Sequence, residues 1–291
     1  MVNRKRKRLP SWLRKKYKTN QEIKETKNIL NELGLNTVCQ SAKCPNIGEC
    51  FSARVATFMI MGNSCSRSCR FCAVPSGPTE PLNPEEPKNI ARAVRKMELA
   101  HVVITSVTRD DLDDGGAGHF AATVKEVRKL NPECVVEVLT PDFEKKKSAL
   151  DKITAIKPDI FNHNVETVPA LYDRVRPEAN YERSLAVLKY IKDNSENVYI
   201  KSGLMVGLGE SESEIIEVME DLREIGCDIL TIGQYLQPTK EHLPVDEYIP
   251  PAKFEEYKEL GEELGFRYVA SGPLVRSSFH ASDFSEKHMK N

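Results

Sequence analysis

Residues 57–72 read TFMIMGNSCSRSCRFC, and this stretch decides the fold because an apolar run is followed closely by three cysteines. The run Thr57–Met61 is typical of a buried strand. Cys65, Cys69 and Cys72 follow it with a C-x3-C-x2-C spacing, so we expect all three on one loop. Chemistry in a βα barrel is found on the loops at the carboxyl ends of its strands. The stretch therefore predicts a barrel strand that carries a metal site at its carboxyl end.

The chemistry of this loop is decided by its number of thiols. Three thiolates can bind three corners of a cubane 4Fe-4S cluster, which leaves one iron without a protein ligand and open to a small molecule. Structural zinc sites need four closed ligands, and no fourth cysteine or histidine lies nearby at zinc-finger spacing. The spacing therefore favours an iron-sulfur cluster over zinc.

A second group of cysteines precedes the strand. Cys39, Cys44 and Cys50, in CQSAKCPNIGEC, have a C-x4-C-x5-C spacing, and we expect them on a loop. Three cysteines in twelve largely polar residues have no hydrophobic reason to be there, so they indicate a second cluster. Cys134 and Cys227 lie in or beside apolar runs without cysteine neighbours and are predicted to be core thiols.

Beyond the cysteines, short apolar or β-branched runs alternate with amphipathic segments of helical period. Strands separated by helices imply parallel pairing with right-handed crossovers. The pattern predicts an α/β fold, a partial (βα)6 TIM-type barrel with N- and C-terminal extensions, and leaves a doubly wound sheet as the alternative. The predicted strands are Thr57–Met61, His101–Thr105, Val135–Leu139, Ile160–Asn164, Val198–Ser202, Ile229–Gln234 and Tyr268–Ser271. The predicted helices are Gln21–Leu33, Pro84–Met97, Phe120–Leu130, Phe143–Ile156, Tyr181–Asp193, Glu212–Ile225 and Ala252–Leu264.

The composition excludes several classes of protein. With 291 residues and 40% hydrophobic content, the chain can bury one large core. Nowhere do eighteen apolar residues run together, and no apolar segment follows the basic start, so we expect a cytoplasmic protein without a membrane span.

The net charge of −1 hides a strongly basic start, because residues 1–18 hold nine cations and no acid. Such a segment is either a solvated tail or a means of steering an acidic protein partner. It lacks an aromatic-basic module that reads bases, so we expect no nucleic-acid partner. The nine cations are Arg4, Lys5, Arg6, Lys7, Arg8, Arg14, Lys15, Lys16 and Lys18.

The C-x3-C-x2-C loop resembles that of the radical S-adenosylmethionine (SAM) superfamily, and Phe71 matches the aromatic residue usual before the last cysteine. The resemblance implies that the open iron chelates the amino and carboxylate groups of SAM. It also implies that an electron from the cluster cleaves SAM to a 5'-deoxyadenosyl radical. The superfamily fold, a partial (βα)6 barrel with the cluster loop after the first strand, agrees with the strand pattern.

The C-x4-C-x5-C group resembles the auxiliary-cluster motif of the lipoyl synthase family, and the similarity extends over nearly the whole chain. It implies a sulfurtransferase that makes the lipoyl cofactor by inserting two sulfur atoms at C6 and C8 of a protein-bound octanoyl-lysine. The auxiliary 4Fe-4S cluster would supply the sulfur. The segments that carry the similarity are LPSWLRKK, ATFMIMG, TSVTRDDLDDGGAGHF, FNHNVETV, VRPEANYERSL, KSGLMVGLGE, IGQYLQPTKEHLPV and GPLVRSSFHA.

The family's auxiliary cluster takes a serine ligand from an R-S-S-Y motif, which here is Arg276, Ser277, Ser278 and Phe279. The resemblance assigns the ligand to Ser278, with Ser277 as the alternative. An alkoxide is a harder ligand than a thiolate, so the iron that it binds should be released most easily. Phe279 departs from the family's tyrosine, which puts in doubt a role for that hydroxyl.

Resemblance to the superfamily also implies contacts with SAM. Asn164 and Glu166, at and just after the end of the fourth predicted strand, are expected at the ribose. Arg183 or Lys201 is expected at the SAM carboxylate, although each can instead form a salt bridge at the barrel rim.

The resemblance divides the chain into three parts: residues 1–50 with the auxiliary cysteines, residues 51–265 as the radical SAM barrel, and residues 266–291 with the serine ligand. It implies octanoylated lipoyl carrier domains as partners, from the acyltransferase subunit of 2-oxoacid dehydrogenases or the glycine cleavage H protein. It further implies a reductant such as ferredoxin or flavodoxin, and an iron-sulfur carrier. Another radical SAM sulfur-inserting enzyme, or a non-catalytic two-cluster electron carrier, is the alternative.

Overall fold

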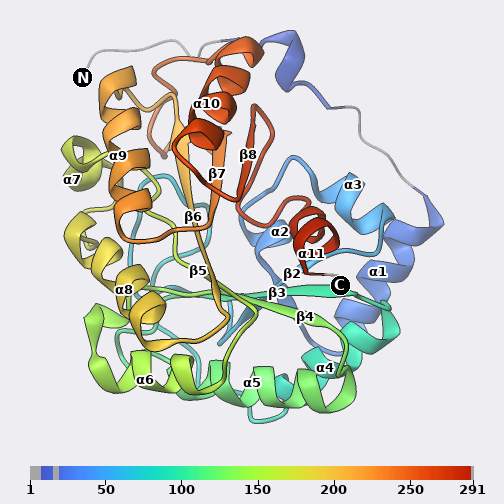
Figure 1. Ribbon diagram of the computed structural model, residues 1–291. Coiled ribbons are helices and arrows are strands. Elements are labelled where there is room, and N and C mark those ends of the chain that lie inside the picture. Colours follow the sequence, from blue (N-terminus) through green and yellow to red (C-terminus); the bar gives the residue numbers. More distant parts are fainter. Residues whose placement is uncertain (1–7, 16–19, 290–291) are drawn as a thin grey trace.

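The computed structural model describes residues 8–15 and 20–289, and its centre is a curved sheet of eight strands (Figure 1). Strands β2 to β8 are parallel and lie side by side in sequence order, with β1 antiparallel beside β2. A doubly wound sheet would reverse its strand order at a switch point, so that alternative is wrong and the predicted barrel is confirmed. The strands are β1 (Asn36–Thr37), β2 (Thr57–Ile60), β3 (His101–Ser106), β4 (Val135–Leu139), β5 (Ile160–Asn162), β6 (Tyr199–Val206), β7 (Ile229–Gln234) and β8 (Tyr268–Gly272).

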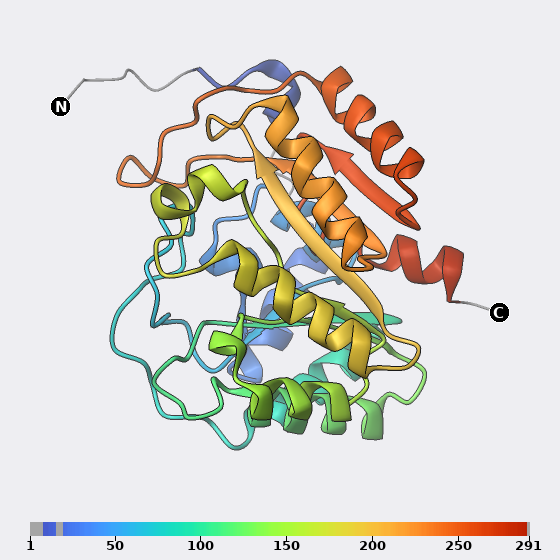
Figure 2. The ribbon, with the colours of Figure 1, turned by 60° about the vertical axis from the view of Figure 1, so that its left-hand side comes forward.

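Helices cover the outer face of the sheet, as both views show (Figures 1 and 2). Each turns an apolar side inward because its buried residues recur at helical spacing. Helix α9 illustrates the local signals: the side chain of Ser211 caps its start in a capping box with Glu214, and Gly226, at φ 82°, follows its end. The covering helices are α4 (Glu86–Lys96), α5 (Ala117–Leu130), α6 (Lys147–Ala155), α8 (Tyr181–Asn194), α9 (Glu212–Glu224) and α10 (Pro251–Glu263).

The first cysteine group does not lie on a plain loop, and that expectation is wrong. Cys39 lies in α2 and Cys50 in α3, with Cys44 in the turn between these two short helices. The Thr37 hydroxyl accepts a hydrogen bond from the backbone of Gln40 and so caps α2. Helices of four and six residues are too short to show a hydrophobic period. The remaining elements are η1 (Ser11–Leu13), α1 (Gln21–Glu32), α2 (Val38–Ser41), α3 (Ile47–Ser52), η2 (Phe143–Lys145), η3 (Pro169–Leu171), α7 (Tyr172–Val175) and α11 (Ser282–His288).

The segment after β8 returns across the sheet to the first cysteine group. Asn46 donates a hydrogen bond from Nδ2 to the carbonyl oxygen of Leu274 at 2.7 Å. A Cβ atom added at Gly233, in β7, would lie 2.2 Å from the Val275 carbonyl oxygen, so the crossing requires glycine at this point. Strand β8 pairs with β7, so the sheet extends to Gly272. The division of the chain at residues 50 and 265 stays a prediction.

No helix in residues 8–15 and 20–289 is long and apolar enough to cross a membrane. Most of the basic start lies outside the described residues, which include only Arg8, Arg14 and Lys15 of its nine cations.

We expect Gly233→Ala to lower the free energy of unfolding of the cluster-free chain by about 2 kcal/mol, because the added methyl group overlaps the Val275 carbonyl oxygen. Urea denaturation followed by circular dichroism measures this difference. Gly118→Ala is the matched control: its added Cβ meets Asp114 Oδ2 at 3.0 Å, and alanine favours the helix by about 1 kcal/mol. Equal stability of the two variants would contradict the close crossing.

Candidate functional site

A cavity of about 480 Å³ lies at the carboxyl ends of the barrel strands. It is lined by side chains from the first cysteine group, the second cysteine group, the loop after β5 and the C-terminal segment. These parts of the chain lie far apart in the sequence, and the fold brings them to one place. The predicted site residues among the lining are Cys39, Cys44, Cys65, Cys69, Cys72, Asn164, Glu166 and Ser278, together with the alternative ligand Ser277.

The loop after β2 is fixed by its backbone. The amide of Cys65 bonds to the Pro75 carbonyl oxygen at 2.8 Å, and the amide of Thr108 donates to Cys65 Sγ at 3.3 Å. Burial raises the pKa of Cys69 to about 11 and that of Cys72 to about 12. The thiols are therefore neutral without metal, and iron must displace their protons when it binds.

Arg67, between the first two cysteines, anchors the same loop to the ends of β3 and β4. It is 7% exposed, and its guanidinium bonds to both carboxylate oxygens of Asp110, at 2.7 and 2.9 Å, and lies 2.8 Å from Asp142 Oδ1. Burial opposes ionisation of Asp142, yet Arg67 brings the net pKa of this carboxyl below its usual range. The sequence reasoning missed Arg67; the acids that follow two successive strands were the signal that could have identified it.

The first cysteine group is enclosed by two distant segments. Lys15 lies 2.6 Å from Glu49 Oε2 and 5.1 Å from the centre of the Phe279 ring. The ring at the position of the family's tyrosine thus contacts a cation, an interaction that does not involve a hydroxyl. Cys50 does not line the cavity. Burial, together with electrostatic interactions with Cys39 and Cys44, raises its pKa to about 12, so it lies near both.

The two serines of the RSSF motif face different neighbours. Ser278 Oγ accepts a hydrogen bond from Thr57 Oγ1 at 2.7 Å, and Thr57 also hydrogen-bonds to the thiol of Cys39. Ser277 Oγ instead lies 2.8 Å from Asn162 Nδ2 and 3.0 Å from Asn164 Oδ1. Ser278 is thereby directed toward the auxiliary cysteines, and Ser277 toward the residues predicted to bind SAM.

Asn164 and Glu166 lie together at the cavity wall. Asn164 Nδ2 donates to Glu166 Oε1 at 3.1 Å. Glu166 adopts φ 68°, which is rare for a residue with a side chain, and its backbone is held by Gly203 and Met205. Burial raises the pKa of its carboxyl. The arrangement leaves a hydrogen-bonding amide and carboxyl at the cavity wall, suited to ribose hydroxyls.

The two cations predicted for the SAM carboxylate do not line the cavity. Arg183 Nε lies 2.8 Å from Asp142 Oδ2, and Lys201 is buried inside the barrel against Glu137. Arg176 does line the cavity: its Nη1 donates to the Asn164 carbonyl oxygen at 2.9 Å, and its buried Nε has no partner among the described residues. The sequence reasoning missed Arg176, because no spacing pattern distinguishes this buried arginine from the exposed arginines of the chain.

The residues present suit two iron-sulfur clusters, of which only the one on the C-x3-C-x2-C loop would lack a fourth protein ligand. Thiolates are the ligands that iron-sulfur clusters prefer, and each group offers three. No set of three or more His, Cys, Asp or Glu side chains in residues 8–15 and 20–289 is arranged around a single metal ion. A cubane lies between its ligands and holds their sulfurs farther apart than one ion does, so this absence does not conflict with clusters.

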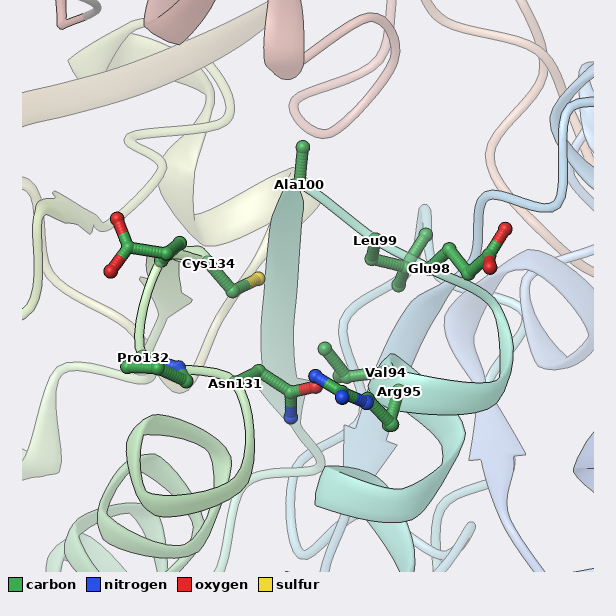
Figure 3. A pocket seen from close by; sticks show the side chains of 9 residues that line it. Val94, Arg95, Glu98, Leu99, Ala100, Asn131, Pro132 and Cys134 are labelled. Carbon is green, nitrogen blue, oxygen red and sulfur yellow. The ribbon is translucent and has the colours of Figure 1, made fainter.

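A second cavity, of about 490 Å³, lies at the opposite end of the barrel (Figure 3). Ala100 and Cys134, which line it, directly precede β3 and β4, so it opens at the amino ends of these strands. Cys134 is 8% exposed and Cys227 is fully buried, which confirms both as core thiols.

Comparisons with known proteins agree with this site. A family model described as the radical SAM superfamily matches residues 59–222. The chain is 57% identical over 274 residues to the lipoyl synthase of Caldanaerobacter subterraneus subsp. tengcongensis, which covers 94% of this chain and 96% of that protein. It is 54% identical over 282 residues to the lipoyl synthase of Alkaliphilus metalliredigens, with 97% of each chain covered.

Among solved structures, the chain resembles methylornithine synthase, with a TM-score of 0.54 and 13% sequence identity over 90% of this chain and 86% of that one. At this identity the resemblance establishes the fold alone.

We expect Arg67→Lys to weaken iron binding by the C-x3-C-x2-C loop about tenfold or more, because lysine cannot bridge two carboxylates with a planar fork. Chelator competition measures this affinity in a chain whose Cys39, Cys44 and Cys50 are replaced by alanine, so that one cluster remains. Arg70→Lys is the control, since Arg70 lies on the same loop and its side chain makes no ion pair with a described residue. An equal effect of both changes would contradict the anchoring role of Arg67.

Proposed function

The chain belongs to the lipoyl synthase family of radical SAM enzymes, and we propose on that premise that its large cavity holds both clusters and SAM. Lipoyl synthases insert two sulfur atoms into a protein-bound octanoyl chain, and they use two 4Fe-4S clusters and SAM. When bound, these groups supply the carbon radical chemistry and the sulfur, which no side chain can provide.

The observation that carries the proposal is the convergence of both cysteine groups and the serine motif on one cavity. A radical made on the substrate at the SAM site can react at the auxiliary cluster only if both sites face the same substrate. The cavity is largely apolar in its walls, which suits an alkyl chain and excludes water from reactive carbon. An electron carrier has no need of such a space, so the convergence favours catalysis over the alternative.

We assign the cluster that activates SAM to Cys65, Cys69 and Cys72, and we propose that Arg67 holds their loop in place. Asn164 and Glu166 accept and donate hydrogen bonds at the ribose. Arg176 takes the place expected for Arg183 or Lys201 at the SAM carboxylate, because it lines the cavity and they do not.

The auxiliary cluster is assigned to Cys39, Cys44, Cys50 and Ser278. The hydrogen bond between Ser278 and Thr57, which also bonds to Cys39, favours Ser278 over Ser277 as the ligand. A hydroxyl oxygen is the least covalent of these four ligands, which suits an iron that must leave when sulfur is consumed.

Octanoylated lipoyl domains are the substrates of this family. We further propose a ferredoxin or flavodoxin as the reductant, an iron-sulfur carrier that rebuilds the auxiliary cluster, and the cytoplasm as the location. Lys15, in the described part of the basic start, forms an ion pair with Glu49, the residue before Cys50. The basic start thus lies near the auxiliary cysteines, a position that suits electrostatic attraction of an acidic carrier.

An anaerobic assay with reconstituted clusters, octanoylated lipoyl domain, SAM and dithionite tests the function. We expect the carrier to gain two sulfur atoms by mass spectrometry while 5'-deoxyadenosine accumulates. Replacing Cys39, Cys44 and Cys50 by alanine should retain deoxyadenosine and abolish sulfur gain, whereas replacing Cys65, Cys69 and Cys72 should abolish both. Deoxyadenosine without sulfur gain in the unmodified chain would overturn the substrate, and no SAM cleavage would overturn the enzyme.

Ser278→Ala should lower the iron content of the auxiliary cluster from four to about three atoms. The iron that loses its protein ligand there is not held by SAM, unlike the open iron of the other cluster. Mössbauer spectroscopy of a chain that lacks Cys65, Cys69 and Cys72 measures this loss. Ser277→Ala is the matched control and should retain all four irons. The reverse pattern would assign the ligand to Ser277.

A further inference from the structure

A chain of buried polar side chains crosses the barrel interior below the cavity. Glu137, in β4, is fully buried, and its two oxygens lie 2.9 and 3.0 Å from Lys201 Nζ in β6. Asn162, at the end of β5, is also fully buried and donates from Nδ2 to Glu137 Oε1 at 2.8 Å. Neither Glu137 nor Lys201 lines the cavity, so the cluster and SAM ligands proposed above leave this group without a role.

The hydrogen bonds continue from this pair into the cavity wall. Asn162 Nδ2 lies 2.8 Å from Ser277 Oγ, Ser277 Oγ lies 3.0 Å from Asn164 Oδ1, and Asn164 Nδ2 lies 3.1 Å from Glu166 Oε1. A continuous path thus joins the buried ion pair to the two residues assigned to the ribose.

The carboxylate at the start of the path fixes the direction of every bond. Burial opposes ionisation of Glu137, but the charge of Lys201 and hydrogen bonds from His101 and Asn162 lower its pKa overall. An ionised carboxylate only accepts, so the amide of Asn162 must present its NH2 group to Glu137. The opposite oxygen, Asn162 Oδ1, is buried without a hydrogen-bond partner among the described residues, a cost that the attraction to Glu137 offsets.

Because the same NH2 group also faces Ser277, the serine oxygen must accept, and its single proton is left for Asn164 Oδ1. Asn164 is then oriented with its carbonyl toward Ser277 and its NH2 group toward Glu166. The donors and acceptors at the cavity wall are therefore set by a charge that lies outside the cavity.

We propose that Ser277 is a positioning residue that couples SAM binding to the seating of the segment that carries Ser278. Its hydroxyl orients the amide of Asn164, and its backbone continues directly into the neighbouring serine. A shift of this segment would break the hydrogen bond to Asn164, and the SAM site would lose its orientation. The proposal rests on the assignment of Asn164 and Glu166 to SAM made above.

Coupling between two sites is reciprocal. SAM must therefore stabilise the seated segment by the same free energy by which the seated segment stabilises bound SAM. This gives a readout independent of catalysis. In the cluster-loaded protein, SAM should slow hydrogen exchange of backbone amides in residues 274–281, and the slowing should depend on the Ser277 hydroxyl.

The test compares SAM affinity by anaerobic calorimetry in the loaded protein and in the Ser277→Ala and Ser277→Thr variants. We expect Ser277→Ala to weaken SAM binding about tenfold, the effect of one lost hydrogen bond, while both clusters keep their iron. Ser277→Thr should restore affinity because it keeps the hydroxyl. SAM should protect residues 274–281 from exchange in the unmodified protein and in Ser277→Thr, and not in Ser277→Ala.

Asn162→Leu provides a second variant, since it removes the donor to Ser277 without touching the RSSF motif, and it should weaken SAM binding to a similar extent. Tyr181→Phe is the matched control, because it keeps the ring and removes only a hydrogen bond to Asp221 between α8 and α9. Neither residue lines the cavity, so affinity should be unchanged. Unchanged affinity in Ser277→Ala, or loss of auxiliary iron from it, would overturn the proposal. Failure of the unmodified protein to cleave SAM would instead overturn the proposed function.

Discussion

The parallel pairing of β2 to β8 is the constraint on which the rest of the protein depends. Parallel strands joined by helices must all end at the same edge, so the loops after β2, β3, β5 and β7 converge there. The cysteine loop after β2 meets the residues after β5 only because of this convergence. Arg67 uses it as well, since one guanidinium reaches acids that follow two different strands.

The barrel alone would leave the auxiliary cysteines without a fourth ligand. Ser278, which we propose as that ligand, lies on a segment more than 200 residues later in the chain. This segment crosses β7 where only glycine fits and is held by Asn46 and Lys15. The enclosure is made by individual polar contacts rather than by a hydrophobic core. Such contacts each contribute little free energy, which is consistent with the proposed shift of this segment.

Charge inside the barrel has a function different from stability. A buried ion pair contributes little net free energy compared with apolar packing. Glu137 and Lys201 are nevertheless connected to the cavity wall by a path of hydrogen bonds. A carboxylate that can only accept imposes one orientation on each amide and hydroxyl after it. The residues that we propose for the ribose are therefore already oriented by these hydrogen bonds, so SAM binding would cost them little orientational freedom.

The sequence by itself determined the strands and helices of the barrel, since their periodic patterns are local, and the identity of the six cluster cysteines as candidates, since their spacings are local too. Resemblance to the radical SAM superfamily suggested Asn164 and Glu166, and both line the cavity. The short helices around Cys39 and Cys50, the roles of Arg67 and Arg176, and the separate directions of Ser277 and Ser278 were decided only by the tertiary structure. The physical reason is that each of these depends on contacts between residues far apart in the chain, and a spacing pattern carries no information about which distant side chain arrives as the partner.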